Sequence, residues 1–202
     1  MAPRIVLVRH GRSAHAPGGW MDVQGMRRWF DDYDRAGIAD DDAPPAPLRE
    51  LAERAGLVVA SDLPRAQMSA ERLAPGQPVV VSPLLREVPI VLPELGTIRM
   101  PIAAWALATG VRHAVARVRG TPAPAEARKQ ARHAAEWLAG LADRHEEVLV
   151  VTHANLRGLL SDVLVGAGWE REPGGARLAH WSAWTFVRGA NARMTGSWVA
   201  RR

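Results

Sequence analysis

The sequence contains no cysteine. This absence excludes disulfide bonds, a thiol nucleophile and cysteine-ligated zinc. Lysine is almost absent as well, because Lys129 is the single lysine among 26 basic residues. The arginines are spread along the chain and form no basic block with interleaved aromatics, so the net charge of +5 gives little support for a nucleic-acid partner. Arginine does suit bidentate recognition of phosphate, which favours an anionic small molecule as the ligand.

Long apolar runs are also missing. No stretch approaches the roughly 20 residues that a helix needs to cross a bilayer, so we expect no membrane partner. The first predicted strand begins at Arg4, which leaves no space for a removable signal peptide and indicates a cytoplasmic protein. We expect one domain over residues 1–202, a length sufficient for a substantial core. The sequence does not indicate the oligomeric state.

Short β-branched runs alternate with amphipathic segments along the chain. Strands are expected at 4–9, 57–61, 78–82 and 148–152, and helices at 22–36, 48–55, 64–73, 123–144 and 155–165. This alternation predicts right-handed crossovers, and therefore an α/β three-layer sandwich with a mainly parallel central sheet flanked by helices.

Two regions are less regular. Segments 181–187 and 194–200 are expected to close the sheet as a hairpin that turns at 189–191. Residues 88–120 contain several prolines between apolar pieces such as 102–107, and we interpret them as a cap insertion over the functional site. Trp20 and Trp105 are expected to take part in this cap and in substrate selection.

Polar residues follow three of the predicted strands. Arg9 and His10 end the first strand, Arg65 lies shortly after the second, and His153 follows the fourth. The carboxyl ends of parallel strands meet at the same edge of a sheet, which is where ligands bind in such folds. Two histidines and two arginines are therefore expected around one anion, with helix N-termini adding backbone N–H donors.

These motifs together resemble the histidine phosphatase superfamily, also called phosphoglycerate mutase-like. The resemblance is carried, in the family's order and approximate spacing, by Leu7-Val8-Arg9-His10-Gly11, Ser61-Asp62-Leu63-Pro64-Arg65-Ala66-Gln67-Met68-Ser69-Ala70, Leu84-Leu85-Arg86-Glu87 and Val150-Val151-Thr152-His153. It spans most of the chain. It implies a phosphoglycerate mutase-like fold and a phosphatase that hydrolyses a phosphate monoester of a small molecule.

The resemblance also implies three catalytic residues. His10 matches the nucleophile that becomes a phosphohistidine, a role that suits an imidazole because one ring nitrogen can be held while the other attacks phosphorus. His153 matches the second histidine, which stabilises the developing charge. Glu87 resembles the acid that protonates the leaving oxygen and then activates water, although the position of this acid varies across the family.

Phosphate binding is assigned to Arg9 and Arg65, because each guanidinium can donate two parallel hydrogen bonds to phosphate oxygens. Ser13 occupies a place where family members often have a polar phosphate ligand. The chain departs from the family at Arg12, where Glu or Gln is usual, so this side chain either adds positive charge near the substrate or points into solvent. Because arginines supply the positive charge, no metal and no cofactor are expected.

Other histidines and other enzyme classes receive less support. His15 is a candidate for the edge of the site, whereas His113, His133, His145 and His180 match no ligand pattern and are interpreted as helix or surface residues. A P-loop enzyme is excluded because no Gly-Lys pair exists, and the glycine pattern of a serine hydrolase is incomplete. No Arg-His-Tyr-Gly-Gly-type stretch, which is usual in phosphoglycerate mutases, follows Glu87, and this favours a phosphatase over a mutase-type transferase. The mutase-type transferase and a non-catalytic phosphate-binding module remain as alternatives, although a module that only binds phosphate needs no nucleophile.

Overall fold

The computed structural model describes residues 2–15, 18–119, 121, 123–176 and 178–190. Its centre is a six-stranded sheet with the order β3-β2-β4-β1-β6-β5. The strands are β1 (Arg4–Arg9), β2 (Leu57–Ser61), β3 (Val79–Ser82), β4 (Glu147–Thr152), β5 (Trp169–Arg171) and β6 (Ala183–Arg188). Strands β3, β2, β4 and β1 are parallel to one another. On the other side of β1, β6 pairs antiparallel with β1, and β5 pairs antiparallel with β6. The mainly parallel α/β sheet predicted from the sequence is confirmed.

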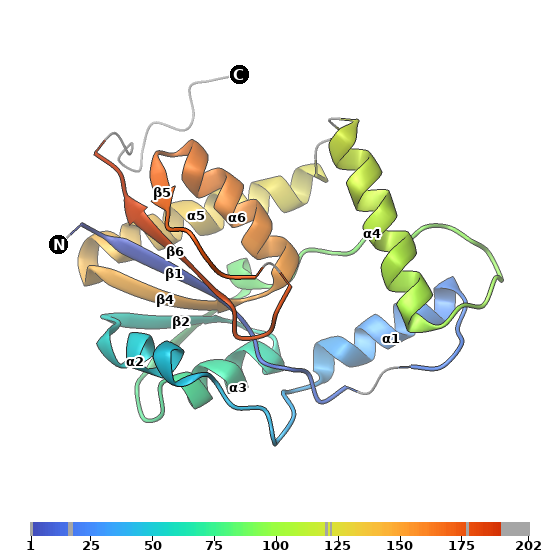
Figure 1. The fold of residues 1–202 in the computed structure, drawn as a ribbon, viewed down its shortest axis with the longest axis horizontal. Helices are drawn as coiled ribbons and strands as arrows, with labels where there is room; N and C mark the ends of the chain where they lie inside the picture. The colour runs from blue at the N-terminus through green and yellow to red at the C-terminus, as the bar shows by residue number, and fades with distance from the viewer. Residues whose placement is uncertain (1, 16–17, 120, 122, 177, 191–202) are drawn as a thin grey trace.

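Helices cover both faces of this sheet (Figure 1). The helices are α1 (Val23–Arg35), α2 (Ala46–Arg54), α3 (Pro64–Leu73), the short 3₁₀ helix η1 (Pro83–Leu85), α4 (Ile102–Val118), α5 (Ala125–His145) and α6 (Ala154–Gly166). Helices α2 and α3 pack on one face, and α5 and α6 pack on the other. No helix in the described part of the chain combines the length and the apolar character that crossing a bilayer requires.

The central strand β1 shows why the apolar runs do not alternate with polar residues. Its residues Ile5, Val6, Leu7 and Val8 are all fully buried. Ile5 and Leu7 belong to the core under α5 and α6, whereas Val6 and Val8 belong to the core under α2 and α3. Because both faces are covered, every residue of the strand must be apolar.

The end of the chain differs from the sequence-based expectation. β6 forms near the predicted position, but it pairs with β5, which precedes it in the sequence. The three residues of β5 are too few to show a periodic pattern. The predicted hairpin partner at 194–200, and the end of the predicted turn at residue 191, lie outside the described residues.

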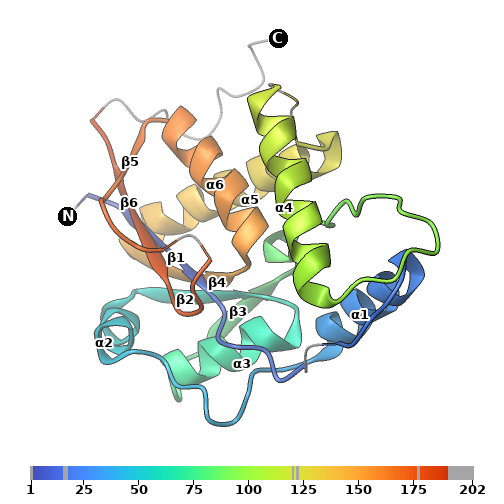
Figure 2. The ribbon, with the colours of Figure 1, turned by 45° about the vertical axis from the view of Figure 1, so that its right-hand side comes forward.

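A third apolar cluster lies beyond the carboxyl edge of the sheet, the edge at which β1, β2 and β4 end. It joins α1, α4 and the segment between residues 88 and 102, which Figures 1 and 2 place together on one side of the molecule. Trp105 is fully buried there, and its indole N–H donates to the carbonyl oxygen of Met21 at 2.9 Å. Trp105 therefore packs inside this cluster.

We expect Trp105→Ala to lower the free energy of unfolding by about 3–5 kcal/mol, because the substitution leaves a large cavity and removes the indole hydrogen bond to the Met21 carbonyl. Trp20→Ala is the matched control: Trp20 is 65% exposed, and its loss should change stability by less than about 0.5 kcal/mol. Urea unfolding followed by circular dichroism measures both. Equal losses of stability in the two variants would contradict the conclusion that Trp105 lies in the interior of this cluster.

Candidate active site

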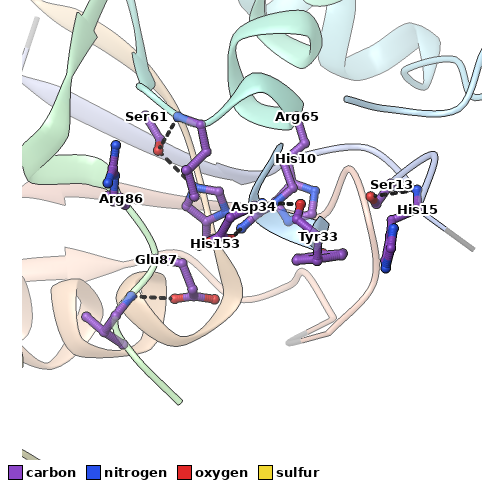
Figure 3. A network of polar contacts seen from close by, with 12 residues as sticks. His10, Ser13, His15, Tyr33, Asp34, Ser61, Arg65, Arg86, Glu87 and His153 are labelled. Carbon is purple, nitrogen blue, oxygen red and sulfur yellow. Dashed lines mark hydrogen bonds and ion pairs between the residues drawn. The ribbon is translucent and has the colours of Figure 1, made fainter. Parts of the chain in front are cut away.

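The carboxyl ends of three parallel strands bring the predicted polar residues together. His10 follows β1, Ser61 ends β2, and His153 follows β4 as the N-cap residue of α6. The rings of His10 and His153 lie with their centroids 5.0 Å apart. Figure 3 shows both imidazoles beside Arg65, with Glu87 approaching from the segment after η1.

His10 is held in one tautomer. Its Nδ1 lies 2.7 Å from the carbonyl oxygen of Gly11, and the side chain is 2% exposed. A carbonyl oxygen can only accept a hydrogen bond, so Nδ1 carries the proton and Nε2 keeps its lone pair. Burial, with the charges of Arg65 and Arg9, lowers the pKa of His10 well below its ordinary value, outweighing the opposing bond to Gly11. The geometry therefore provides a neutral ring with a nucleophilic Nε2.

His153 is also neutral but offers a donor. Its Nε2 lies 2.9 Å from the hydroxyl oxygen of Ser61. The same hydroxyl oxygen accepts a hydrogen bond from the backbone N–H of Leu63, which leaves the hydroxyl proton free to be donated to Nε2. When the Ser61 hydroxyl donates to Nε2, the proton of the ring resides on Nδ1, which is buried and has no partner among the described residues. Burial is the main cause that lowers the pKa of His153, followed by the charges of His10 and Arg65.

Arg65 is fixed by contacts with α1. Its Nη1 donates to the carbonyl oxygen of Tyr33 at 2.9 Å, and its Nη2 pairs with Asp34 at 3.0 Å. The guanidinium carbon also lies 4.2 Å from the centroid of the Tyr33 ring. The side chain is 1% exposed, and Nε finds no partner among the described residues. Arg65 thus presents its Nε–H without a partner in a buried setting, which is a favourable arrangement for an anion.

Arg9 reaches the same region from the end of β1. It donates to the carbonyl oxygen of Leu178 and to the Tyr33 side chain, and its buried Nε has no partner within the described residues. Burial is the main cause that lowers the pKa of Arg9, although the guanidinium remains cationic in any ordinary buffer. Burial likewise raises the pKa of Tyr33, whose phenol therefore stays neutral.

Glu87 lies at the N-terminus of α6. Its carboxylate accepts hydrogen bonds from the backbone N–H groups of Val88, Asn155 and Leu156 at 3.1, 3.3 and 3.0 Å. Burial raises the pKa of Glu87 and outweighs these bonds, which act in the opposite direction. The result is a carboxyl group that takes up a proton more readily than an exposed glutamate.

Ser13 and Arg12 are less closely joined to this group. The hydroxyl of Ser13 accepts from the backbone N–H of His15 at 3.1 Å, and Figure 3 shows these two residues beyond Tyr33. The guanidinium of Arg12 forms an exposed ion pair with Asp41 at 2.5 Å. The Arg12 side chain therefore points toward solvent, which was one of the two alternatives predicted for it.

The sequence did not identify two residues that the structure places at the site, Tyr33 and His180. The apolar periodicity of α1 assigns Tyr33 to a core face, yet its ring contacts both Arg65 and His10. The interpretation of His180 as a helix or surface residue is wrong, because its ring lies 5.8 Å from that of His10. No local pattern in the sequence signals this proximity. The side chain of His113 lies outside the described residues.

Gly11 is required for close packing. Its φ is not left-handed, but a Cβ at this position would overlap the indole ring of Trp181 and the carboxylate of Asp42. The glycine therefore lets the segment before β6 pack directly against the turn after β1. In the described part of the chain, no group of three or more histidine, aspartate or glutamate side chains is arranged to hold a metal ion.

Comparisons with known proteins agree with this fold. The sequence model of the histidine phosphatase superfamily (branch 1) matches residues 5–176. A solved structure described as mycobacterial hydrolase 2 aligns with a TM-score of 0.54 and 22% identity, covering 96% of this chain and 94% of that one. A mutant phosphoserine phosphatase from Entamoeba histolytica in complex with phosphoserine aligns with a TM-score of 0.53 and 14% identity, covering 94% and 92%. No curated protein matches the chain. At these identities the solved structures show a common fold.

Burial of neutral His10 and His153 should make the folded state sensitive to acid. Unfolded imidazoles take up protons below about pH 6.5, whereas the folded ones have lowered pKa values. The unfolded state then binds more protons, so the free energy of unfolding falls as the pH drops below about 6.5 and is unaffected by these groups above it.

Urea unfolding between about pH 7 and pH 5 tests this linkage. We expect His153→Gln to make the fall in stability shallower than in the wild type. His133→Gln, at an exposed position on α5, should leave the slope unchanged. A wild-type slope in His153→Gln would show that this histidine does not contribute.

Proposed function

The chain belongs to the histidine phosphatase superfamily, and we propose that it hydrolyses a phosphate monoester of a small molecule through a phosphohistidine intermediate on His10. The observation that carries the proposal is the His10 ring itself. Its Nδ1 is held by the Gly11 carbonyl, and its Nε2 is left as an uncharged nucleophile beside the buried Arg65 and the half-buried Arg9. A group that only bound phosphate would not need a lone pair in this position.

Arg9 and Arg65 bind the phosphate in this mechanism. A phosphate monoester carries negative charge that repels a nucleophile, and the two guanidinium groups offset this charge before attack. The unused Nε donors of both side chains are consistent with this role. Ser13 is a weaker candidate for the same role, because its described contacts are with His15 and Ile38.

The first step transfers the phosphoryl group to the enzyme. Nε2 of His10 forms a bond to phosphorus as the bond between phosphorus and the leaving oxygen breaks. The N–H of Nδ1 keeps its hydrogen bond to Gly11, which stabilises the positive charge that develops on the ring. His153 donates from Nδ1 to a phosphoryl oxygen, where negative charge builds up in the transition state.

Glu87 moves the protons. In its protonated form, favoured by burial, it donates a proton to the leaving oxygen, and the resulting carboxylate then accepts a proton from the water that attacks the phosphohistidine. The bond between phosphorus and Nε2 breaks in this second step, inorganic phosphate leaves, and Glu87 is protonated again. The two steps regenerate the starting enzyme.

We also propose that residues 1–202 form a single domain in which residues 88–120 act as a cap. The support is the position of α4 and the preceding segment, which pack with α1 beyond the carboxyl edge of the sheet. A cap in this position would contact the part of the substrate outside the phosphate group. Trp105 would then act by holding the cap together, since its side chain is buried within it.

Hydrolysis of p-nitrophenyl phosphate tests the nucleophile. We expect turnover that a chelator does not change and that His10→Ala lowers by about 10³-fold or more, since no other group forms the covalent intermediate. His133→Ala, at an exposed position, is the matched control and should retain full activity. Turnover that survives His10→Ala would contradict the proposal. Absence of turnover in the wild type, with phosphate still bound, would favour the mutase or binding-module alternative.

Glu87→Gln tests the acid. We expect kcat/KM, which reports the transfer to His10 and not the hydrolysis of the phosphohistidine, to fall by about 10²–10⁴-fold for an alkyl phosphate, whose leaving oxygen needs a proton. The loss of kcat/KM should be smaller for p-nitrophenyl phosphate, because p-nitrophenolate leaves without protonation. Glutamine keeps an acceptor oxygen for the N–H groups of α6, so the fold should persist. An equal loss of kcat/KM for both substrates would mean that Glu87 does not supply the proton to the leaving oxygen.

A further inference from the structure

The segment between β5 and β6 brings a third histidine to the site. It extends along the sheet toward the carboxyl end of β1 (Figure 1), and His180 lies near its end. The ring of His180 is 5.8 Å from that of His10, with an angle of 46° between the two planes. The side chain is partly buried. The mechanism described above does not use it.

Arginine side chains hold this segment by its backbone. The fully buried Arg157 of α6 donates to the carbonyl oxygens of Ser182 at 2.5 Å and Ala176 at 3.3 Å, and its guanidinium lies 4.2 Å from the Trp184 ring centroid. Arg9 donates to the carbonyl oxygen of Leu178. The same arginine that is assigned to the phosphate thus also fixes the backbone two residues before His180.

Trp181 fixes the other side of His180. Its backbone N–H donates to the carbonyl oxygen of Arg9 at 3.1 Å, and its indole N–H donates to Asp42 at 2.8 Å. Its φ of 58° is in the left-handed region, which a tryptophan adopts only when surrounding contacts hold it. These contacts therefore determine where the neighbouring imidazole of His180 lies.

His180 approaches His10 from a different segment of the chain than His153 does. The charged groups around His180 are Arg9, Asp42 and Arg12, from β1, the segment before α2 and the turn after β1. His153 shares the proximity of Arg9 and also lies near Arg65 and Arg86. Within the described residues, no backbone or side-chain group hydrogen-bonds the ring of His180. A partly buried imidazole without a protein partner, beside His10 and the guanidinium of Arg9, is well placed to contact an anion.

We propose that His180 is a phosphate-binding residue of the active site and donates a hydrogen bond from its ring N–H to an oxygen of the phosphate group next to His10. This inference rests on the proposed function, because it takes the anion at His10 to be a phosphate. The ring adds a donor from the segment before β6, in addition to Arg9, Arg65 and His153. Its contribution is to binding, and it forms no covalent bond.

Binding of inorganic phosphate, measured by isothermal titration calorimetry on the full chain, tests the proposal. Hydrogen bonds to charged groups are strong enough that His180→Ala should weaken phosphate binding by about 10-fold or more. His180→Asn retains a short N–H donor and should recover most of the affinity. His133→Ala serves as the control and should bind phosphate like the wild type. Near-ultraviolet circular dichroism of Trp181 and Trp184 reports whether the segment keeps its packing.

Two outcomes would overturn the inference. Wild-type phosphate binding in His180→Ala would show that the ring does not contact the anion. Equal weakening in His180→Ala and His180→Asn, with an altered tryptophan signal, would show that the ring acts only on the segment that carries it. Because the assay measures binding without turnover, it remains decisive even if the wild type shows no hydrolysis. Wild-type turnover together with unchanged phosphate binding in His180→Ala would leave the proposed function intact and remove only the role of His180.

Discussion

The burial of positive charge beside uncharged imidazoles is the constraint on which the site depends. Arg9 and Arg65 lie close enough to His10 to oppose its protonation, and burial acts in the same direction. The arginines thereby keep the lone pair of Nε2 available while they create a positive potential for an anion. In the proposed mechanism the same groups bind the substrate and keep His10 unprotonated, which explains why both lie next to the ring.

Buried guanidinium groups require partners, and this requirement shapes the surrounding structure. Arg65 bonds to the backbone and side chains at the end of α1, and Arg157 bonds to the carbonyl oxygens of the segment before β6. Removing one partner of such a buried pair leaves an uncompensated charge, so the loss of any one of these contacts destabilises the fold. Elements distant in sequence are therefore tied to the carboxyl edge of the sheet through arginine, which matches the near absence of lysine in the chain.

At the carboxyl end of β4, the N-terminus of α6 holds both His153 and the carboxyl group to which the proposed mechanism assigns proton transfer. His153 is the N-cap residue of α6, and the first N–H groups of that helix donate to Glu87. These bonds favour the carboxylate, while burial favours the protonated form, and burial prevails. A group balanced between the two forms is suited to give up a proton in one step and accept it in the next.

The sequence by itself determined the layered fold and the residues at the ends of β1, β2 and β4. Local apolar runs define buried strands, and parallel strands place their carboxyl ends together, so Arg9, His10, Arg65 and His153 could be assigned to one place without coordinates. Only the tertiary structure decided which nitrogen of His10 is free, that Tyr33 packs under Arg65, and that His180 approaches the nucleophile. The physical reason is that these properties come from contacts between segments far apart in the chain, such as the close packing of Trp181 against Gly11, which no local pattern encodes.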